Sequence, residues 1–269
     1  MPSVSNTIDR VRRHFGDNLS PDDAYLSYHD VRVTKLDVDS IKHDWLTDNA
    51  IAFWEEYLER EELSRVPAAQ IVLLRPSMSF MLMNTPDPLT LKEVLPNFSK
   101  TTHIFLPIND NRDVNLAEGG SHWSLLLVSI IDGVSFHYDS LAPCNDMEAR
   151  NTSAKLEVLL GKKLGFIHMS DSPQQENGSD CGVFVCLLMK HLLLKRLLRA
   201  DASKKISMSM SGQNVNAQAG RKTMVRIIDS QRKEGERRRS RSVSPCRKDG
   251  PKSRSPPRIG EENESLKSQ

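Results

Sequence analysis

Four residues with the side chains of thiol catalysis follow one another along the chain. His122 lies in Gly-Gly-Ser-His-Trp-Ser, Asp139 in Phe-His-Tyr-Asp-Ser, and Cys181 in Gln-Gln-Glu-Asn-Gly-Ser-Asp-Cys-Gly, where Gln175 precedes the cysteine by six positions. A thiol nucleophile, an imidazole base, a carboxylate that orients the base and an amide that donates to an oxyanion are the parts of a cysteine protease. The sequence therefore predicts nucleophilic thiol chemistry.

The position of Cys181 favours a reactive thiol over a packing residue. A lone buried cysteine is usually a small hydrophobic residue. Cys181, however, separates a polar loop from an apolar segment that predicts a buried helix over Cys181–Leu198, with the compact Gly182 beside it. A cysteine at a helix N-terminus meets free N–H groups and the positive end of the helix dipole, which favour the thiolate. The other cysteines are interpreted as core, loop and tail residues: Cys186, Cys144 and Cys246.

A predicted β-hairpin brings the base and its carboxylate together. The apolar stretches 123–131 and 134–138 flank an Asp-Gly turn, which is typical of two antiparallel strands. His122 precedes the first strand and Asp139 follows the second, so the hairpin returns the chain to its start. The two side chains are therefore expected to lie side by side, as an Asp that orients a His must.

Neighbouring residues compete for the same roles. His137 lies two positions before Asp139 and is a weaker candidate base, and Asp180 is an alternative carboxylate that would oppose ionisation of the adjacent thiol. Gln175 is the expected oxyanion donor, together with the backbone N–H of Cys181. Spacing alone does not exclude Gln174.

The remaining pattern predicts an α+β domain. Further strands are expected at 31–36, 71–74, 103–108 and 164–169, and further helices at 49–62, 76–84, 89–95, 148–160 and 221–236. Asp39 or Ser40 is the expected cap of the segment that follows the strand at 31–36, and residues 45–48 are expected to open the helix at 49–62. The charged residues of this helix are expected to face solvent: Glu55, Glu56, Glu59 and Glu61, with Arg60.

Charge and cysteine spacing narrow the function classes. The net charge is +2, but residues 1–200 carry 20 Lys and Arg against 27 Asp and Glu, whereas residues 201–269 carry 17 against 8. An acidic main domain argues against nucleic acid as its ligand and suits a basic polypeptide tail. Because there is no CxxC pair, no completed zinc motif, no signal peptide and no membrane-spanning run, we expect a reducing cytoplasmic or nuclear setting.

The C-terminal segment changes in composition. From Arg237 the sequence becomes rich in Arg, Ser and Pro, a composition that cannot bury a core. The expected organisation is therefore one domain over residues 1–236, whose first 30 residues are polar, followed by a basic disordered tail over residues 237–269. Such a tail is open to phosphorylation and is compatible with nuclear targeting.

At these motifs the chain resembles the Ulp/SENP family of cysteine proteases for ubiquitin-like modifiers. The likeness extends from about residue 30 to about residue 236, and the ordered His-Trp, Asp and Gln-x-x-x-x-x-Cys-Gly motifs carry it. The stretches Leu-Pro-Ile-Asn-Asp-Asn, Gly-Gly-Ser-His-Trp-Ser-Leu-Leu and Phe-His-Tyr-Asp-Ser resemble the family's deneddylase branch. The resemblance implies a papain-like fold of the Ulp type, with a mixed sheet flanked by helices.

The resemblance also implies site residues and a substrate. His122, Asp139 and Cys181 match the family's triad, and Gln175 matches its oxyanion residue. Trp123, interpretable as core from the sequence alone, matches the roof of a channel for a Gly-Gly tail. Three further positions match residues of the substrate channel: Trp45, Asp48 and, in a loop longer than that of relatives, Asn109.

The implied activity is removal of the neddylation modifier from conjugates such as cullins, and processing of its precursor. The implied enzyme is a monomer that needs no metal or cofactor. The sequence leaves two further functions open, a SUMO-specific protease and an inactive binding module for a ubiquitin-like modifier.

Overall fold

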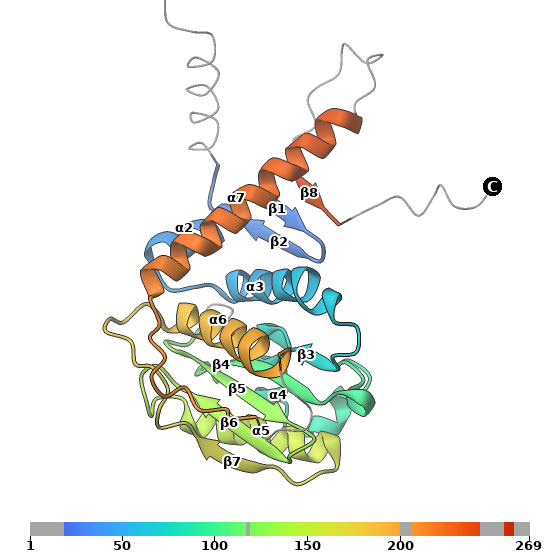
Figure 1. The fold of residues 1–269 in the computed structure, drawn as a ribbon, viewed down its shortest axis with the longest axis vertical. Helices are drawn as coiled ribbons and strands as arrows, with labels where there is room; N and C mark the ends of the chain where they lie inside the picture. The colour runs from blue at the N-terminus through green and yellow to red at the C-terminus, as the bar shows by residue number, and fades with distance from the viewer. Residues whose placement is uncertain (1–18, 117–118, 200–205, 243–255, 261–269) are drawn as a thin grey trace, which may run out of the picture.

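In the computed structural model, the described residues are 19–116, 119–199, 206–242 and 256–260. Figure 1 shows a central sheet with helices on both faces, and a smaller sheet under the long helix α7. This arrangement agrees with the expected α+β class and with the expected mixed sheet between helices. Within the described part of the chain, no helix combines the length and apolar character needed to cross a membrane.

The central sheet has five strands in the order β3-β4-β5-β6-β7, and each overlaps a predicted strand. The pairs β3–β4 and β6–β7 are parallel, and the other two pairs are antiparallel. The sheet is therefore mixed, and the β5–β6 hairpin lies inside it. The strands are β3 (Ile71–Leu73), β4 (His103–Asn109), β5 (Trp123–Ser129), β6 (Val134–Tyr138) and β7 (Gly165–His168).

Both faces of this sheet are covered by apolar residues. Alternate positions of β4 and β5 belong to two separate buried clusters: Phe105 and Leu127 to one, Leu106 and Leu126 to the other. Successive side chains of a strand point to opposite faces, so a strand buried on both sides becomes continuously apolar. That explains why these strands appear in the sequence as unbroken apolar runs.

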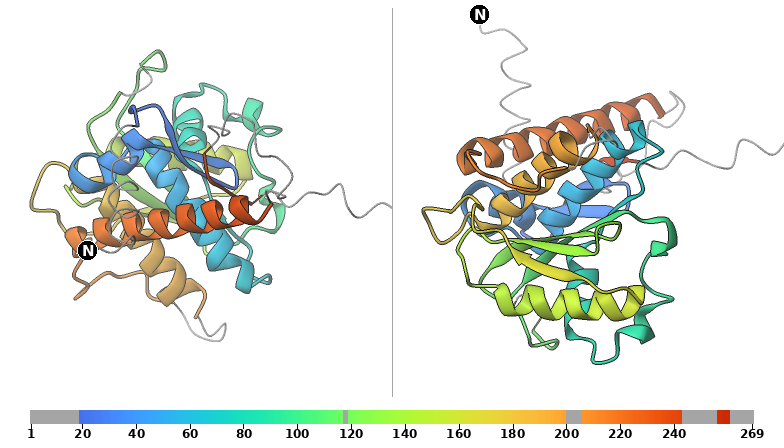
Figure 2. Two further views of the ribbon diagram at one scale, coloured as in Figure 1. Left: turned by 90° about the horizontal axis from the view of Figure 1, so that it is seen from above. Right: turned by 60° about the horizontal axis from the view of Figure 1, so that its bottom comes forward.

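Two layers of helices supply this cover. On one face lie α3 (Asp48–Glu61) and α6 (Cys181–His191), and on the other lie α4 (Pro76–Asn84) and α5 (Asp146–Leu160) (Figure 2). The helix predicted over 181–198 is α-helical only to His191 and continues as a π-helical segment, Leu192–Leu197. Short 3₁₀ turns complete the main domain: Leu63–Arg65, Pro88–Leu91 and Phe98–Lys100.

The smaller sheet contains elements that sequence patterns did not reveal. Its strands are β1 (Ala24–Tyr28), β2 (Val31–Thr34) and β8 (Arg258–Ile259), in the order β2-β1-β8. Helix α2 (Lys35–His43) follows directly on β2. The cap expected at Asp39 or Ser40 is wrong, because Thr34 caps α2 in a capping box with Asp37 and Thr47 caps α3. Strand β1 (Ala24–Tyr28) lies in the segment interpreted only as polar.

The boundary expected after residue 236 is wrong for the described residues. Helix α7 spans Ala217–Ser242, and β8 (Arg258–Ile259) pairs in parallel with β1. The Ile259 side chain is buried against the core. The rest of the predicted tail lies outside the described residues.

The expected solvent exposure of Glu55 and Glu56 is also wrong. Both carboxylates are buried, and Arg75 lies among Glu55, Glu56 and Glu59. Glu56 also accepts a hydrogen bond of 2.7 Å from Arg60, whereas neither carboxylate oxygen of Glu55 has a hydrogen-bond partner among the described residues. Burial raises the pKa of Glu55 well above its usual range, and the charge of Arg75 offsets this only in part.

This environment predicts that Glu55→Gln stabilises the fold in a pH-dependent way. A carboxyl with a raised folded-state pKa contributes most stability below its unfolded pKa and loses it as pH rises. Equilibrium unfolding in urea is therefore expected to give similar free energies near pH 4. Near pH 7 the variant should be more stable by roughly 1 kcal/mol or more. An equal or lower stability of Glu55→Gln at pH 7 would show that the carboxylate is paired and ionised.

Candidate active site

Cys181 is the first residue of α6 and is almost fully buried. Asp180 occupies the N-cap position, and the Phe184 N–H donates to the Asp180 carbonyl at 2.9 Å. Gly182 follows because a Cβ there would lie 2.8 Å from the Cβ of Leu46. The tight contact with Leu46 thus fixes the start of α6 and the position of the Cys181 thiol.

His122 and Asp139 are in contact. The Nε2 atom of His122 lies 2.6 Å from Oδ1 of Asp139, and both side chains are buried. The β5–β6 hairpin places them together, since Leu125 pairs with Tyr138 just inside it. Because Nε2 faces Asp139, Nδ1 is the nitrogen left to bond the thiol of Cys181. The Cys181 thiol lies close enough to help raise the pKa of the His122 imidazole.

Electrostatics keep this pair charged. Burial lowers the pKa of His122, but hydrogen bonds to Asp139 and Cys181 outweigh burial and raise it to about 9. Burial raises the pKa of Asp139, but bonds from His122 and from the N–H groups of Asn145 and Leu141 hold it below its usual range. An imidazolium beside a carboxylate is therefore the stable state of this pair at neutral pH.

Two polar residues that the sequence analysis did not single out hold the pair in place. Asn145 is fully buried; its N–H donates to Asp139 at 3.0 Å, and its Nδ2 donates to the backbone carbonyls of Ile108 and His122. Asp110 accepts bonds from the N–H groups of Ser121 and His122. Neither position carries a sequence pattern, because each bond joins loops distant in sequence.

The hydrogen bonds of the two glutamines separate their roles. Gln174 donates from Nε2 to the carbonyls of both Asp139 and Ser172, at 2.8 and 2.9 Å, which uses both amide hydrogens. Gln175 donates from Nε2 to the Asn177 carbonyl at 2.6 Å and accepts from Ser140 Oγ. Since a side-chain amide has two N–H donors, Gln175 retains one for an oxyanion.

The competing base and carboxylate have different environments. His137 is fully buried, bonds to Ser124 Oγ at 2.9 Å, and burial lowers its pKa to about 4, so it is a weak base at neutral pH. Asp180 pairs with Arg221 at 2.8 Å, which offsets the negative charge beside Cys181. The remaining cysteines are buried at 186 and exposed at 144, as interpreted, whereas Cys246 lies outside the described residues.

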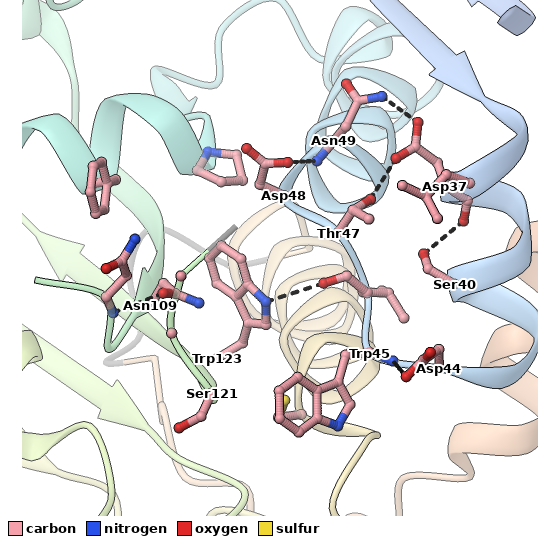
Figure 3. Close-up of a pocket in the computed structure, with 18 of the residues that line it drawn as sticks. Asp37, Ser40, Asp44, Trp45, Thr47, Asp48, Asn49, Asn109, Ser121 and Trp123 are labelled. Carbon is pink, nitrogen blue, oxygen red and sulfur yellow. Dashed lines mark hydrogen bonds between the residues drawn. The ribbon is translucent and has the colours of Figure 1, made fainter. Parts of the chain in front are cut away.

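Cys181 and His122 are among the residues that line a cleft of about 780 Å³. Trp123 and Trp45 line it, and the Nε1 of Trp123 donates to the Leu46 carbonyl at 3.2 Å (Figure 3). Asp48, exposed at the start of α3, and Asn109, at the end of β4, also line the cleft. Within the described chain five aspartates and no lysine or arginine line it: Asp22, Asp37, Asp39, Asp44 and Asp48.

The glycines before His122 allow the cleft wall to turn. Gly120 has a φ of 88°, and a Cβ there would lie 2.0 Å from Oδ1 of Asn109. Only glycine fits this left-handed backbone and close contact. The Gly-Gly of the sequence motif is thus required by the loop that delivers His122 to Asp139.

Comparison with known proteins assigns this arrangement to a family. Residues 44–218 match the model of the Ulp1 protease family, C-terminal catalytic domain. The chain belongs to the Ulp1 protease family. This is a family of cysteine proteases, and the buried thiol at the start of α6 accords with it. A crystal structure of the Ulp1 C-terminal protease domain, in complex with the yeast SUMO orthologue Smt3, has the same fold, with a TM-score of 0.58. Its sequence identity is 18%, over 82% of this chain and 93% of that one.

Curated relatives are more similar in sequence. NEDD8-specific protease 2 of Schizosaccharomyces pombe is 36% identical over 77% of this chain and 50% of its own length. NEDD8-specific protease 1 of Arabidopsis thaliana is 34% identical over 62% of this chain and 74% of its own length. Sentrin-specific protease 8 of Homo sapiens is 32% identical over 61% of this chain and 78% of its own length. The chain spans about half the length of the fission-yeast relatives that it matches.

Arg221 joins α7 to the nucleophile loop of this Ulp1-family fold. It lies just beyond the matched residues, is nearly buried, and donates from Nε to Asp180 and from Nη2 to the Ser179 carbonyl. Its Nη1 donates to three backbone carbonyls at the end of α2, those of Ser40, Ile41 and Asp44. Arg221 thus connects three segments around the residues immediately before Cys181.

Arg221→Lys is expected to weaken both stability and turnover. A lysine has a compact charge and cannot supply the planar set of donors that Arg221 uses. We expect a loss of about 3 kcal/mol in unfolding free energy and a roughly 10-fold to 100-fold lower kcat/KM. Denaturant unfolding and steady-state kinetics measure both quantities. Arg226→Lys, at an exposed position on the same helix, is the control. Wild-type behaviour of Arg221→Lys would contradict this connecting role.

Proposed function

We propose that this chain is a cysteine isopeptidase that releases a ubiquitin-like modifier, the neddylation modifier NEDD8, by cutting after its terminal Gly-Gly. The observation that carries the proposal is the buried set of Cys181, His122 and Asp139, of which Cys181 and His122 line the same cleft as Trp45 and Trp123. Cleavage of conjugates such as neddylated cullins and of the modifier precursor is the proposed activity.

The proposed reaction is acyl transfer through a thioester. The Cys181 thiolate attacks the carbonyl carbon of the terminal glycine, and the C–N bond to the substrate lysine breaks. The imidazolium of His122, oriented by Asp139, protonates the leaving amine. His122, now neutral, accepts a proton from water, and the resulting hydroxide attacks the thioester carbonyl. The C–S bond then breaks and releases the Cys181 thiolate beside the imidazolium. The donors for both tetrahedral oxyanions are the Cys181 N–H and Gln175 Nε2.

Gln175→Ala is expected to lower kcat about 10²-fold to 10³-fold, because it removes a donor that acts on the transition state. KM is expected to change little. Gln174→Ala removes the amide that holds the Asp139 and Ser172 carbonyls, so it is the matched control and should act mainly on stability. Kinetics of the two variants separate the roles. A larger kcat defect in Gln174→Ala would reverse the assignment.

Two observations support the neddylation modifier as substrate. The relatives that are more than 30% identical are named NEDD8-specific or sentrin-specific proteases. The cleft is lined by five aspartates and no described cation, which suits a basic C-terminal tail. Trp123 as channel roof, with Trp45, Asp48 and Asn109 along the wall, is part of the proposal.

A SUMO-specific protease is the second candidate within the same chemistry. The structure with Smt3 shares the fold at low identity, so it bears on the architecture and leaves the modifier open. An inactive binding module is the third candidate. The intact set of Cys181, His122, Asp139 and Gln175 argues against it.

Hydrolysis of fluorogenic C-terminal amides of NEDD8, SUMO and ubiquitin tests the proposal. We expect kcat/KM for the NEDD8 substrate to exceed the other two by at least about 10²-fold. A SUMO preference would move the chain to the second candidate. No hydrolysis of any substrate, by protein with a wild-type melting temperature, would favour the binding module.

The proposed enzyme is monomeric and acts in the cytoplasm and nucleus. The basic Arg/Ser composition between α7 and β8 supports the nuclear part of this proposal. Deletion of residues 243–255 tests it, because α7 and β8 both remain. An unchanged distribution of a fluorescent fusion would count against a targeting role.

A further inference from the structure

Three side chains with metal-binding donors meet at the edge of the sheet. His137 lies on β6, His168 lies beside it on β7, and Asp146 is the first residue of α5. Figure 1 shows α5, β6 and β7 next to one another. One ligand atom from each residue lies within 4.8 Å of the others. The sequence analysis did not foresee this cluster, because the three positions follow no metal-binding spacing.

Two of these donors have no hydrogen-bond partner among the described residues. The Nδ1 atoms of His137 and His168 are both inaccessible to solvent and unbonded, and the His137 side chain is completely buried. They lie 3.9 and 3.6 Å from Oδ1 of Asp146. Those separations are too long for hydrogen bonds. They are close to the roughly 3.3 Å between ligand atoms around a tetrahedral ion with bonds of about 2.0–2.1 Å.

We propose that His137, His168 and Asp146 form a binding site for a divalent transition-metal ion of the zinc class. Two imidazole nitrogens and one carboxylate oxygen are a ligand set that such ions accept. The ligand atoms are Nδ1 of each histidine and Oδ1 of Asp146. A water molecule completes the coordination, because His168 and Asp146 are partly exposed.

Neighbouring residues orient the three ligands. Ser124 Oγ lies 2.9 Å from Nε2 of His137; when Nε2 carries the proton, Nδ1 presents its lone pair to the cluster. Arg150 donates to Oδ2 of Asp146 at 2.6 Å, which leaves Oδ1 as the inward oxygen. Such supporting bonds on the far side of each ligand are characteristic of metal sites in proteins.

A simple ion pair explains the geometry less well. If a protonated His168 paired with Asp146, its Nδ1–H would approach the carboxylate to about 2.8 Å, which is closer than 3.6 Å. The buried Nδ1 of His137 would still lack a partner, at a cost of about 1–3 kcal/mol. A bound ion satisfies all three donors.

Two ligands of the proposed site flank Asp139 in the sequence. His137 precedes this segment, and Asp146 follows Asn145, whose N–H bonds the Asp139 carboxylate. A bound ion therefore ties the end of β6 to the start of α5. Its role is structural, because it would stabilise the loop that positions Asp139.

Calorimetric titration of Zn²⁺ into the full chain tests the proposal. The parent protein is Cys181→Ala, because a thiol beside an imidazole also binds zinc. We expect one ion per chain and a melting temperature that rises with zinc. His168→Ala and Asp146→Asn should each weaken binding at least about 10-fold and abolish the thermal shift. Because both positions are partly exposed, we expect both variants to fold. Their melting temperatures in the absence of metal check this.

His43→Ala is the matched control, because it removes an exposed histidine outside the cluster. It should bind zinc like the parent. Equal zinc binding by the parent and by the His168→Ala, Asp146→Asn and His43→Ala variants would overturn the proposal. Failure of the parent to bind zinc would also overturn it. Binding lost only in His43→Ala would place the ion elsewhere.

Discussion

Cys181→Ala is expected to lower kcat/KM for a C-terminal modifier substrate by about 10⁴-fold or more, and His122→Ala by a similar factor. The double variant should be no worse than either single variant. The reason is that the thiolate and the imidazolium act as one unit: once either is lost, the other has no partner in the attack. Steady-state kinetics of the three proteins measure this non-additivity.

Cys144→Ala provides the control for thiol removal, because Cys144 is exposed and lies outside the Cys181–His122–Asp139 set. It should retain wild-type kinetics. Cys181→Ala protein should also keep its affinity for the modifier, since the cleft is unchanged. Residual activity of Cys181→Ala within about 10-fold of wild type would remove the thiol from the mechanism.

Asp139→Asn is expected to lower kcat about 10⁴-fold and to change the pH profile. The carboxylate bonds Nε2 of His122 at 2.6 Å and helps to raise its pKa to about 9. Without that charge the pKa of His122 falls, so the imidazolium that protonates the leaving amine is lost at lower pH. The alkaline limb of kcat/KM, expected near pH 9 in the wild type, should shift toward acid.

Asp132→Asn is the matched control, because Asp132 lies at the opposite end of the same hairpin and accepts a bond from Ser129 Oγ. Its pH profile should follow the wild type. An Asp139→Asn variant with an unshifted alkaline limb would show that another group holds His122 in its protonated state.

The sequence predicts the central sheet well because its strands are buried on both faces. The residues of β4 and β5 are apolar throughout, and the Asp-Gly turn marks the hairpin. In the small sheet β2 overlaps the strand expected at 31–36, whereas β1 and β8 were missed. Only two residues form β8, and their pairing with β1 closes a contact across most of the chain. No local pattern records such a pairing.

The predicted site residues lie in locally patterned segments, whereas the missed ones depend on contacts between distant segments. Cys181, His122 and Asp139 stand at ends of strongly patterned elements, so hairpin geometry and helix position locate them. Asn145 and Arg221 act through bonds to backbone carbonyls of distant segments, which leave no mark on spacing. Buried charged residues are missed for the same reason. Because Glu55 is charged, the sequence predicts that it faces solvent, but it is buried beside Arg75, a residue from a distant segment.

Two electrophilic probes, NEDD8 and SUMO each carrying a C-terminal thiol-reactive group, test both the nucleophile and the modifier in one reaction. Intact mass and peptide mapping locate any adduct. We expect one covalent adduct with the NEDD8 probe, located at Cys181 and absent in Cys181→Ala, and none with the SUMO probe. An adduct with SUMO alone, or attachment at a cysteine other than Cys181, would contradict this expectation.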